Sequence, residues 1–139
     1  IKAACNILDA CISHIYHQRM LEVRNLDTAQ QIEKYINDNI AWDLSIEHLC
    51  AHFSVSRAEL YQIFHTSFNS SVADYIRSKR IAMAEQMIRT TAMQISEIAA
   101  NVGFYDYNYF SKVFHRKFGC SPREYRKNLE SSEEEAEKK

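Results

Sequence analysis

Cysteine and histidine are the side chains of this chain with the greatest capacity for catalysis or metal binding. The four cysteines are Cys5, Cys11, Cys50 and Cys120, and they show no C-x-x-C or similar spacing. Cys11, His14 and His17 recur every three residues. No fourth ligand lies near them in the sequence, and a structural zinc site needs four. We therefore expect thiols in a reducing compartment, with neither a metal nor a cofactor.

The charged side chains are distributed unevenly. Residues 107–127 carry six Lys and Arg and one Glu, a net charge of +5, whereas residues 129–139 carry five Glu and two Lys, a net charge of −3. The formal net charge of −1 therefore hides a basic segment beside an acidic one. A basic segment is suited to nucleic-acid phosphates. We expect residues 129–139 to be a disordered, solubilising tail.

Length and composition restrict the class of protein. A chain of 139 residues, 46% of them hydrophobic, can form one compact domain with a short appendage. Two Gly and one Pro are few breakers, which favours an all-α fold. No apolar run approaches the roughly 20 residues that span a membrane, and no signal peptide is present, so we expect a cytoplasmic protein. The chain begins at Ile1, which suggests a fragment of a longer protein.

An internal repeat with a period of about 50 residues organises the chain. The first copy reads Ile46-x2-Leu49-x3-Phe53-x-Val55, then Leu60-x3-Phe64-x3-Phe68-Asn69-x-Ser71-x3-Tyr75. The second reads Ile95-x2-Ile98-x3-Val102-x-Phe104, then Phe110-x3-Phe114-x3-Phe118-Gly119-x-Ser121-x3-Tyr125. Each copy predicts a helix of about eight residues, a turn of three or four, and a second helix of about eleven.

The turn and the exit of each copy carry residues that tolerate a positive φ. In the second copy these are Gly103 and Gly119, the only glycines in the chain. In the first copy Asn69 closes the second helix, and Ser54 occupies the turn with some strain. Helix-start signals agree with these boundaries: the capping box Ser56-Arg57-Ala58-Glu59, Asp106, and Ser121-Pro122-Arg123-Glu124.

Two further helices are predicted before the first copy and one between the copies. Residues 1–25 predict a helix whose apolar seam has 4-3-4-3 spacing, and residues 28–40 a second helix with Thr28 as its cap. Trp42 follows in a loop and is expected to pack on the core. Residues 72–90 predict one spacer helix, about 28 Å long. Residues 1–27 would be either the last helix of a missing upstream domain or a dimer contact.

A short helix, a tight turn and a longer helix form the helix-turn-helix motif, whose second helix enters the major groove of DNA. Plain packing of helical hairpins is the alternative, which two matched copies disfavour.

Residues 44–127 resemble the AraC/XylS family of bacterial transcription activators. The most specific stretch is Ile98-Ala99-x2-Val102-Gly103-Phe104-x5-Phe110-Ser111-Lys112-x-Phe114-x3-Phe118-Gly119-x-Ser121-Pro122-x2-Tyr125-Arg126. The first copy also matches, in Ser56-x3-Leu60-x3-Phe64 and Tyr75-x4-Arg80-x3-Ala84.

This resemblance implies a double helix-turn-helix domain over residues 28–128, with a first unit at about 44–68 and a second at about 94–118. It implies a sequence-specific regulator that binds double-stranded DNA with two recognition helices in successive major grooves. RNA polymerase would be a further partner.

The outward positions of the two predicted recognition helices supply the candidate contacts. Base-contacting candidates, at the family's contact positions, are Ala58, Tyr61, Gln62, Tyr107, Asn108, Ser111 and Lys112. Gln62 and Asn108 suit adenine, and Lys112 suits guanine or a phosphate. Many relatives hold Arg at position 62, which leaves the preferred base open, and Tyr107 is alternatively a half-buried packing residue. Phosphate-contacting candidates are Arg57, His65, His115, Arg116 and Lys117.

Two other functions remain as alternatives. Some repair proteins join such a domain to a methyl-accepting cysteine, but no cysteine here has an adjacent Pro or an activating His and carboxylate. We therefore do not expect an enzyme. The near-neutral charge and Gln62 leave open a helical protein-interaction module that does not bind DNA.

Overall fold

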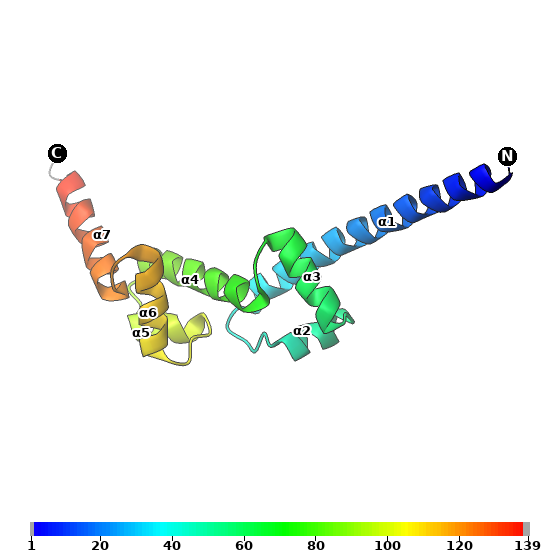
Figure 1. Cartoon of the computed structure of the whole chain (residues 1–139). Coiled ribbons are helices and arrows are strands. Elements are labelled where there is room, and N and C mark those ends of the chain that lie inside the picture. Colours follow the sequence, from blue (N-terminus) through cyan, green and yellow to red (C-terminus); the bar gives the residue numbers. More distant parts are fainter. Residues whose placement is uncertain (1, 138–139) are drawn as a thin grey trace.

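The computed structural model describes the backbone of residues 2–137 and the side chains of residues 6–132. All regular structure in this part of the chain is helical, as the sequence predicts (Figure 1). The helices are α1 (Lys2–Asp38), α2 (Ile46–Phe53), α3 (Arg57–Phe68), α4 (Val72–Thr90), α5 (Ile95–Asn101), α6 (Tyr107–Phe118) and α7 (Pro122–Glu137). Within the described residues, no helix is both long and apolar enough to cross a bilayer.

The helices form two units, one at each end of α4. The end of α1 packs with α2 and α3 in the first unit, and α5, α6 and α7 pack together in the second (Figure 1). Each unit has its own hydrophobic core. The first core includes Ile32, Ile36, Leu49, Leu60, Ile63 and Phe64. The second includes Ile98, Val102, Phe104, Phe110, Val113 and Phe114.

Helix α4 belongs to both cores. Its first half contributes Val72 and Ile76 to the first core, and its second half contributes Ile81 and Ile88 to the second. Met83 packs against both. The spacer helix predicted over residues 72–90 is therefore confirmed, and it is a structural member of each unit.

The turns take the backbone conformations that the sequence predicts. Ser54 and Asn69 have φ values of 53° and 48°, and Gly103 and Gly119 have values of 91° and 77°. The two non-glycine residues lie at the same places in the first unit as the two glycines in the second. The repeat thus extends to the backbone geometry of its turns.

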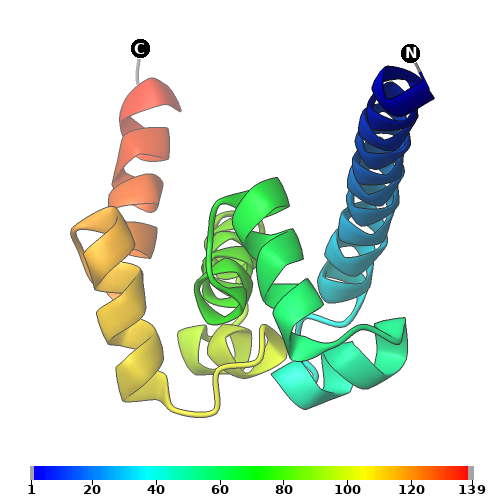
Figure 2. The ribbon, with the colours of Figure 1, turned by 45° about the vertical axis from the view of Figure 1, so that its right-hand side comes forward.

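The helical organisation of the N-terminal region differs from the prediction. Residues 1–25 and 28–40 were expected to form separate helices, but α1 runs without a break from Lys2 to Asp38. Thr28 is not a cap: its hydroxyl donates a hydrogen bond to the Arg24 carbonyl at 2.9 Å, inside the helix. The predicted boundary at residues 27 and 28 therefore falls within α1, whose first part projects from the first unit (Figure 2).

Two other expectations are wrong. Trp42 lies in the predicted loop, but its side chain is 72% exposed and does not fill the core. Residues 129–137, expected to be disordered, continue α7 as far as Glu137. That helix starts from a strong signal, because Ser121 accepts a hydrogen bond from the Glu124 backbone while the Glu124 carboxylate accepts one from Ser121.

Ser54 provides a test of the strain in the first turn. We expect Ser54→Gly to raise the free energy of unfolding by about 0.5–1 kcal/mol, because glycine relieves the left-handed conformation at some cost in chain entropy. Gly119→Ala is the matched change in the opposite direction, because it places a side chain at a position with a left-handed backbone. An added Cβ there meets no atom within 4 Å, so its destabilisation of about 1 kcal/mol would report backbone strain alone. Urea denaturation measures both, and a destabilised Ser54→Gly would contradict this account.

Candidate nucleic-acid interface

Helices α3 and α6 each have a buried side and an exposed side. Leu60, Ile63 and Phe64 of α3 are buried, as are their counterparts Phe110, Val113 and Phe114 of α6. The repeat positions Leu60, Phe64, Phe110 and Phe114 are thus all buried. The opposite sides hold the predicted contact residues, and Figures 1 and 2 show both helices on the viewer's side of α4.

The exposed side of α3 carries little free positive charge. Ala58, Tyr61, Gln62 and His65 are all exposed, and the Tyr61 ring is 48% exposed. Arg57 is also exposed, but it forms an ion pair with Glu47 of α2. A phosphate would therefore have to compete with this carboxylate for Arg57.

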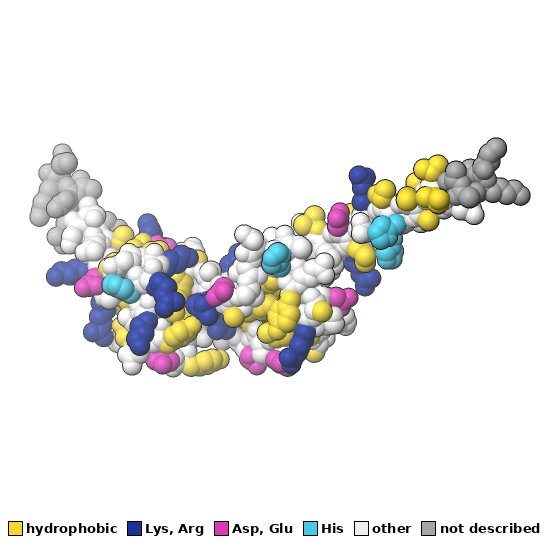
Figure 3. Space-filling view, viewed as in Figure 1, with side chains coloured by type: hydrophobic (Ala, Val, Ile, Leu, Met, Phe, Trp, Pro, Cys, Tyr) yellow, Lys and Arg dark blue, Asp and Glu magenta, His cyan; other side chains and the backbone are white. Residues whose placement is uncertain are grey.

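The exposed side of α6 is basic. Asn108, Lys112, His115, Arg116 and Lys117 are exposed, and Figure 3 shows Lys and Arg side chains gathered over this end of the molecule. The helix starts at Asp106, whose carboxylate accepts hydrogen bonds from the backbone of Asn108 at 2.8 Å and of Tyr109 at 3.3 Å. This cap leaves the Asn108 and Lys112 side chains available to a ligand.

Two of the predicted base-contacting residues are less accessible. Tyr107 and Ser111 are half-buried. The Tyr107 ring lies against the second core, with its centroid 6.2 Å from that of Phe110. The packing role that was the alternative for Tyr107 therefore accounts for much of its surface.

Equivalent clefts in the two units differ in chemistry. In each, the recognition helix meets the start of the next helix. The cleft of the second unit is lined by Asn108, Ser111, Lys112, His115, Arg116 and Ser121. The cleft of the first unit is lined by no Lys, Arg, Asp or Glu, and Tyr61 and Phe64 make it largely apolar. The two exposed sides are therefore suited to different kinds of contact with the same polyanion.

Two exposed aromatic residues, Tyr105 and Tyr109, were not identified from the sequence. Tyr105 is 88% exposed and Tyr109 is 45% exposed, and together with Trp42 they line a groove between the two units. Tyr105, Tyr107 and Tyr109 alternate along the sequence, and this was the available signal. The sequence prediction includes only Tyr107 of these three, and Tyr105 lies before the start of α6.

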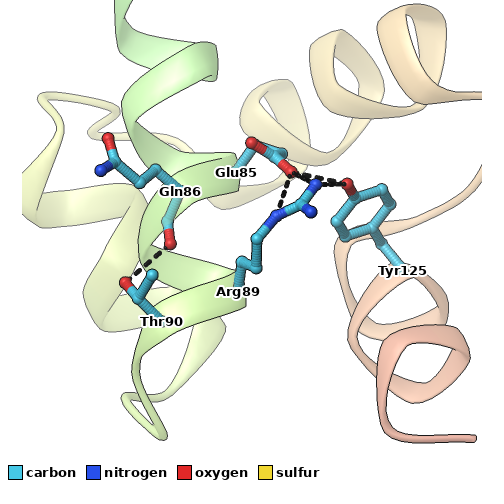
Figure 4. Close-up of polar contacts among 5 residues, drawn as sticks. All are labelled: Glu85, Gln86, Arg89, Thr90 and Tyr125. Atoms are coloured by element: carbon cyan, nitrogen blue, oxygen red, sulfur yellow. Dashed lines mark hydrogen bonds and ion pairs between the residues drawn. The ribbon is translucent and has the colours of Figure 1, made fainter. Parts of the chain in front are cut away.

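Tyrosines near the start of α4 and α7 brace the recognition helices. In the second unit, the Tyr125 ring packs edge-on against Phe114 of α6, with centroids 5.5 Å apart. Its hydroxyl donates to Glu85 of α4 at 2.6 Å, and Arg89 donates to the same carboxylate (Figure 4). The ring holds α6 while the hydroxyl ties the assembly to α4.

The first unit repeats this brace with different partners. Tyr75 packs edge-on against Phe64 of α3, with centroids 5.4 Å apart. Its hydroxyl donates to Glu33 of α1 at 2.9 Å, and Lys79 donates to the same carboxylate at 2.8 Å. The end of α1 thus supplies the accepting carboxylate in the first unit, as α4 does in the second.

The carboxylates of both braces have lowered pKa values. The hydrogen bond from Tyr125, followed by that from Arg89, lowers the pKa of Glu85. The hydrogen bonds from Lys79 and then Tyr75 lower the pKa of Glu33. In each case partial burial opposes the shift without cancelling it. Both braces therefore stabilise the folded state when the carboxylate is ionised.

The described residues contain no group of three or more His, Cys, Asp and Glu arranged to hold a metal ion. Cys11 is exposed, and Cys50 and Cys120 are half-buried, all as free thiols. Cys5 lies outside the residues whose side chains are described. Both exposed helices offer hydrogen-bond donors, and α6 also offers unpaired cations among the described residues.

Comparisons with known proteins agree on the type of domain. A family model described as a helix-turn-helix domain matches residues 49–128. The chain is 33% identical to the transcriptional activator RhaR of Cronobacter sakazakii over 100 residues, which are 72% of this chain and 35% of RhaR. The chain therefore spans about a third of the length of that relative.

Two further matches cover most of the other protein. The regulatory protein SoxS of Escherichia coli is 34% identical over 104 residues, which are 70% of this chain and 97% of SoxS. A crystal structure of a transcriptional regulator from Chromobacterium violaceum, described as AraC-type, superposes with a TM-score of 0.66 at 25% identity. It covers 78% of this chain and 94% of that chain.

The Glu85 brace predicts a specific dependence of stability on pH. A carboxylate with a lowered pKa contributes stability above its unfolded pKa of about 4.3 and loses it as the pH falls. We expect Glu85→Gln to lower the free energy of unfolding by about 1–2 kcal/mol at pH 7. Between pH 7 and pH 3 this variant should lose less stability than the parent chain.

Glu22→Gln, at an exposed position of α1, is the matched control and should behave as the parent does. Denaturant titrations at several pH values supply the measurement. Parallel pH profiles for Glu85→Gln and the parent would show that Glu85 does not stabilise the fold in this way.

Proposed function

Because the chain belongs to the AraC/XylS family of helix-turn-helix transcription regulators, we propose that it is the DNA-binding part of a bacterial regulator. It inserts α3 and α6 into successive major grooves on one face of a promoter. The observation that carries this proposal is the pair of exposed recognition helices on the same side of α4. With 19 residues, α4 is about 28 Å long, comparable to the roughly 34 Å of one DNA turn.

The two recognition helices contribute unequally to binding. We assign base contacts to Ala58, Tyr61 and Gln62 of α3, and to Tyr107, Asn108, Ser111 and Lys112 of α6. Exposure favours Asn108 and Lys112 in α6, since Tyr107 and Ser111 are half-buried. We assign phosphate contacts to Arg57, His65, His115, Arg116 and Lys117. Because Arg57 already pairs with Glu47, most phosphate neutralisation comes from α6.

The proposed regulator works in the cytoplasm, where bacterial DNA and RNA polymerase are found, and acts on transcription by contact with RNA polymerase. A second copy of the chain covers the exposed apolar stripe of α1. Leu8, Ile12 and Ile15 are each more than half exposed, with exposed fractions of 61%, 63% and 55%. Their 4-3 spacing is the pattern of a two-helix seam, which supports a homodimer.

The function is tested by selecting duplexes from a random-sequence pool with the full chain. We expect enrichment of sites with two conserved segments centred about ten base pairs apart. A folded chain that binds no duplex, even at low salt, would overturn the proposal and favour a protein-interaction module.

The unequal charge of the two recognition helices predicts different responses to salt. The logarithm of the binding constant falls with the logarithm of salt concentration in proportion to the phosphates neutralised. We expect Lys112→Ala to flatten this slope by about one. Gln62→Ala should weaken binding to the selected duplex with little change of slope. A larger change of slope for Gln62→Ala would show that this division between α3 and α6 is wrong.

The stripe on α1 predicts reversible self-association. Sedimentation equilibrium of the parent chain should show a monomer and dimer in exchange, and Ile12→Lys should shift the population to monomer because it places a charge in the seam. His14→Lys changes the opposite side of the same helix and should leave the equilibrium unaltered. A parent chain that stays monomeric at every concentration, or two variants with equal effects, would rule out this dimer.

A further inference from the structure

Arg80 lies where the two units meet. It is in the middle of α4, between Ile76, which belongs to the first core, and Ile81, which belongs to the second. Its side chain is half-buried. The other side chains at this junction come from segments that are distant in the sequence.

The guanidinium of Arg80 binds the segment that follows α1. Its Nε donates a hydrogen bond to the Ile40 carbonyl at 3.0 Å, and its Nη2 donates one to the Trp42 carbonyl at 2.9 Å. The rigid fork of an arginine can satisfy two carbonyls at once, which a lysine ammonium does less well. Arg80 thus fastens the loop of the first unit to α4.

The turn of the second unit rests against the same guanidinium. A Cβ added to Gly103 would lie 2.8 Å from both Cζ and Nε of Arg80, and 2.9 Å from the Ile40 carbonyl oxygen. A side chain at position 103 would therefore clash with its neighbours unless they moved. The turn between α5 and α6 therefore contacts both Arg80 and the loop that Arg80 holds.

This junction complements the limited packing between the units. The extensive helix–helix contacts of the described chain lie within one unit or involve α4. A long helix curves gently along its length, so contacts beside its midpoint help to fix the angle between the units that it joins. Arg80 and Gly103 supply such a restraint close to the midpoint of α4.

We propose that Arg80 is a positioning residue that fixes the angle between α3 and α6, and so determines which spacing of two DNA half-sites the protein accepts. This inference rests on the proposed function for its consequence on DNA. Its structural part, a fixed angle between the units, holds for the free protein.

Burial lowers the pKa of the Arg80 guanidinium, and the nearby Tyr105 and Asp43 oppose this shift. Arginine nevertheless stays protonated in proteins. The junction therefore holds its charge over the whole range of pH in which the protein is folded, and the restraint does not depend on pH.

The first experiment measures spacing discrimination. The duplex enriched by the parent chain is compared with duplexes that have one base pair inserted or removed between the half-sites, which rotates one site by about 35°. We expect Arg80→Ala to reduce the affinity ratio between matched and shifted duplexes by about tenfold, the lower end of the effect of losing one hydrogen bond to a charged group. Binding to duplexes with one intact half-site should be unchanged.

Two variants separate this role from general damage. Arg80→Lys keeps the charge and should show an intermediate loss of discrimination. Arg77→Ala removes a neighbouring cation of α4 that pairs with Asp74 of the same helix at 2.6 Å, and it should keep the discrimination of the parent. If Arg80→Ala weakens all duplexes equally, or changes nothing, the proposal is wrong.

The second experiment does not use DNA. Residual dipolar couplings of the parent chain should fit one alignment tensor for both units, whereas those of Arg80→Ala should require a separate tensor for each. A single tensor for Arg80→Ala would overturn the proposal even if no duplex were ever enriched. Failure of the parent to enrich any duplex, with couplings that change as expected, would overturn the proposed function alone.

Discussion

Everything in this structure depends on α4 being shared by two hydrophobic cores. Each unit is a small cluster of helices that closes its core only by burying one half of α4: Val72 and Ile76 at one end, Ile81 and Ile88 at the other. Burial of apolar surface is the main source of stability for such clusters. The same burial that folds each unit therefore sets where its recognition helix lies. Fold and binding geometry have one physical origin.

The repeat explains how one local design serves both recognition helices. A tyrosine one turn into the helix that follows the recognition helix packs on a phenylalanine of the recognition helix. Its hydroxyl donates a hydrogen bond to a carboxylate on the helix that precedes the unit, Glu33 of α1 or Glu85 of α4. The two units differ in what they expose rather than in how they are built. The second unit exposes several cations on α6, whereas α3 of the first unit exposes Tyr61 and only one Arg, Arg57, which pairs with Glu47.

Much of this architecture could be predicted from the sequence, because the signals are local. The paired turns, the caps at Ser56 and Asp106 and the buried side of each recognition helix follow from residue type and spacing. The helix boundary predicted at Thr28 is wrong, because the threonine hydroxyl donates to the Arg24 carbonyl inside the helix and does not cap a new one. The continuation of α7 into the acidic residues shows that a strong start can extend a helix over a segment of like charges.

Contacts between segments that are distant in the sequence could not be predicted from local signals. The junction of Arg80 with Ile40, Trp42 and Gly103 joins residues 23 to 40 positions apart, and no spacing rule predicts it. The exposure of Trp42 has the same origin, since its backbone carbonyl is held at this junction while its ring stays outside the core. Gly103 could be identified as a turn residue, but its close approach to a guanidinium appears only in three dimensions.

In the proposed complex, two recognition helices held by one shared helix read two successive major grooves on the same face of DNA. Hydroxyl-radical footprinting of the bound duplex tests it most directly. We expect two protected patches, offset by about one helical turn and lying on one face of the duplex. A single patch, or two patches on opposite faces of the duplex, would contradict it.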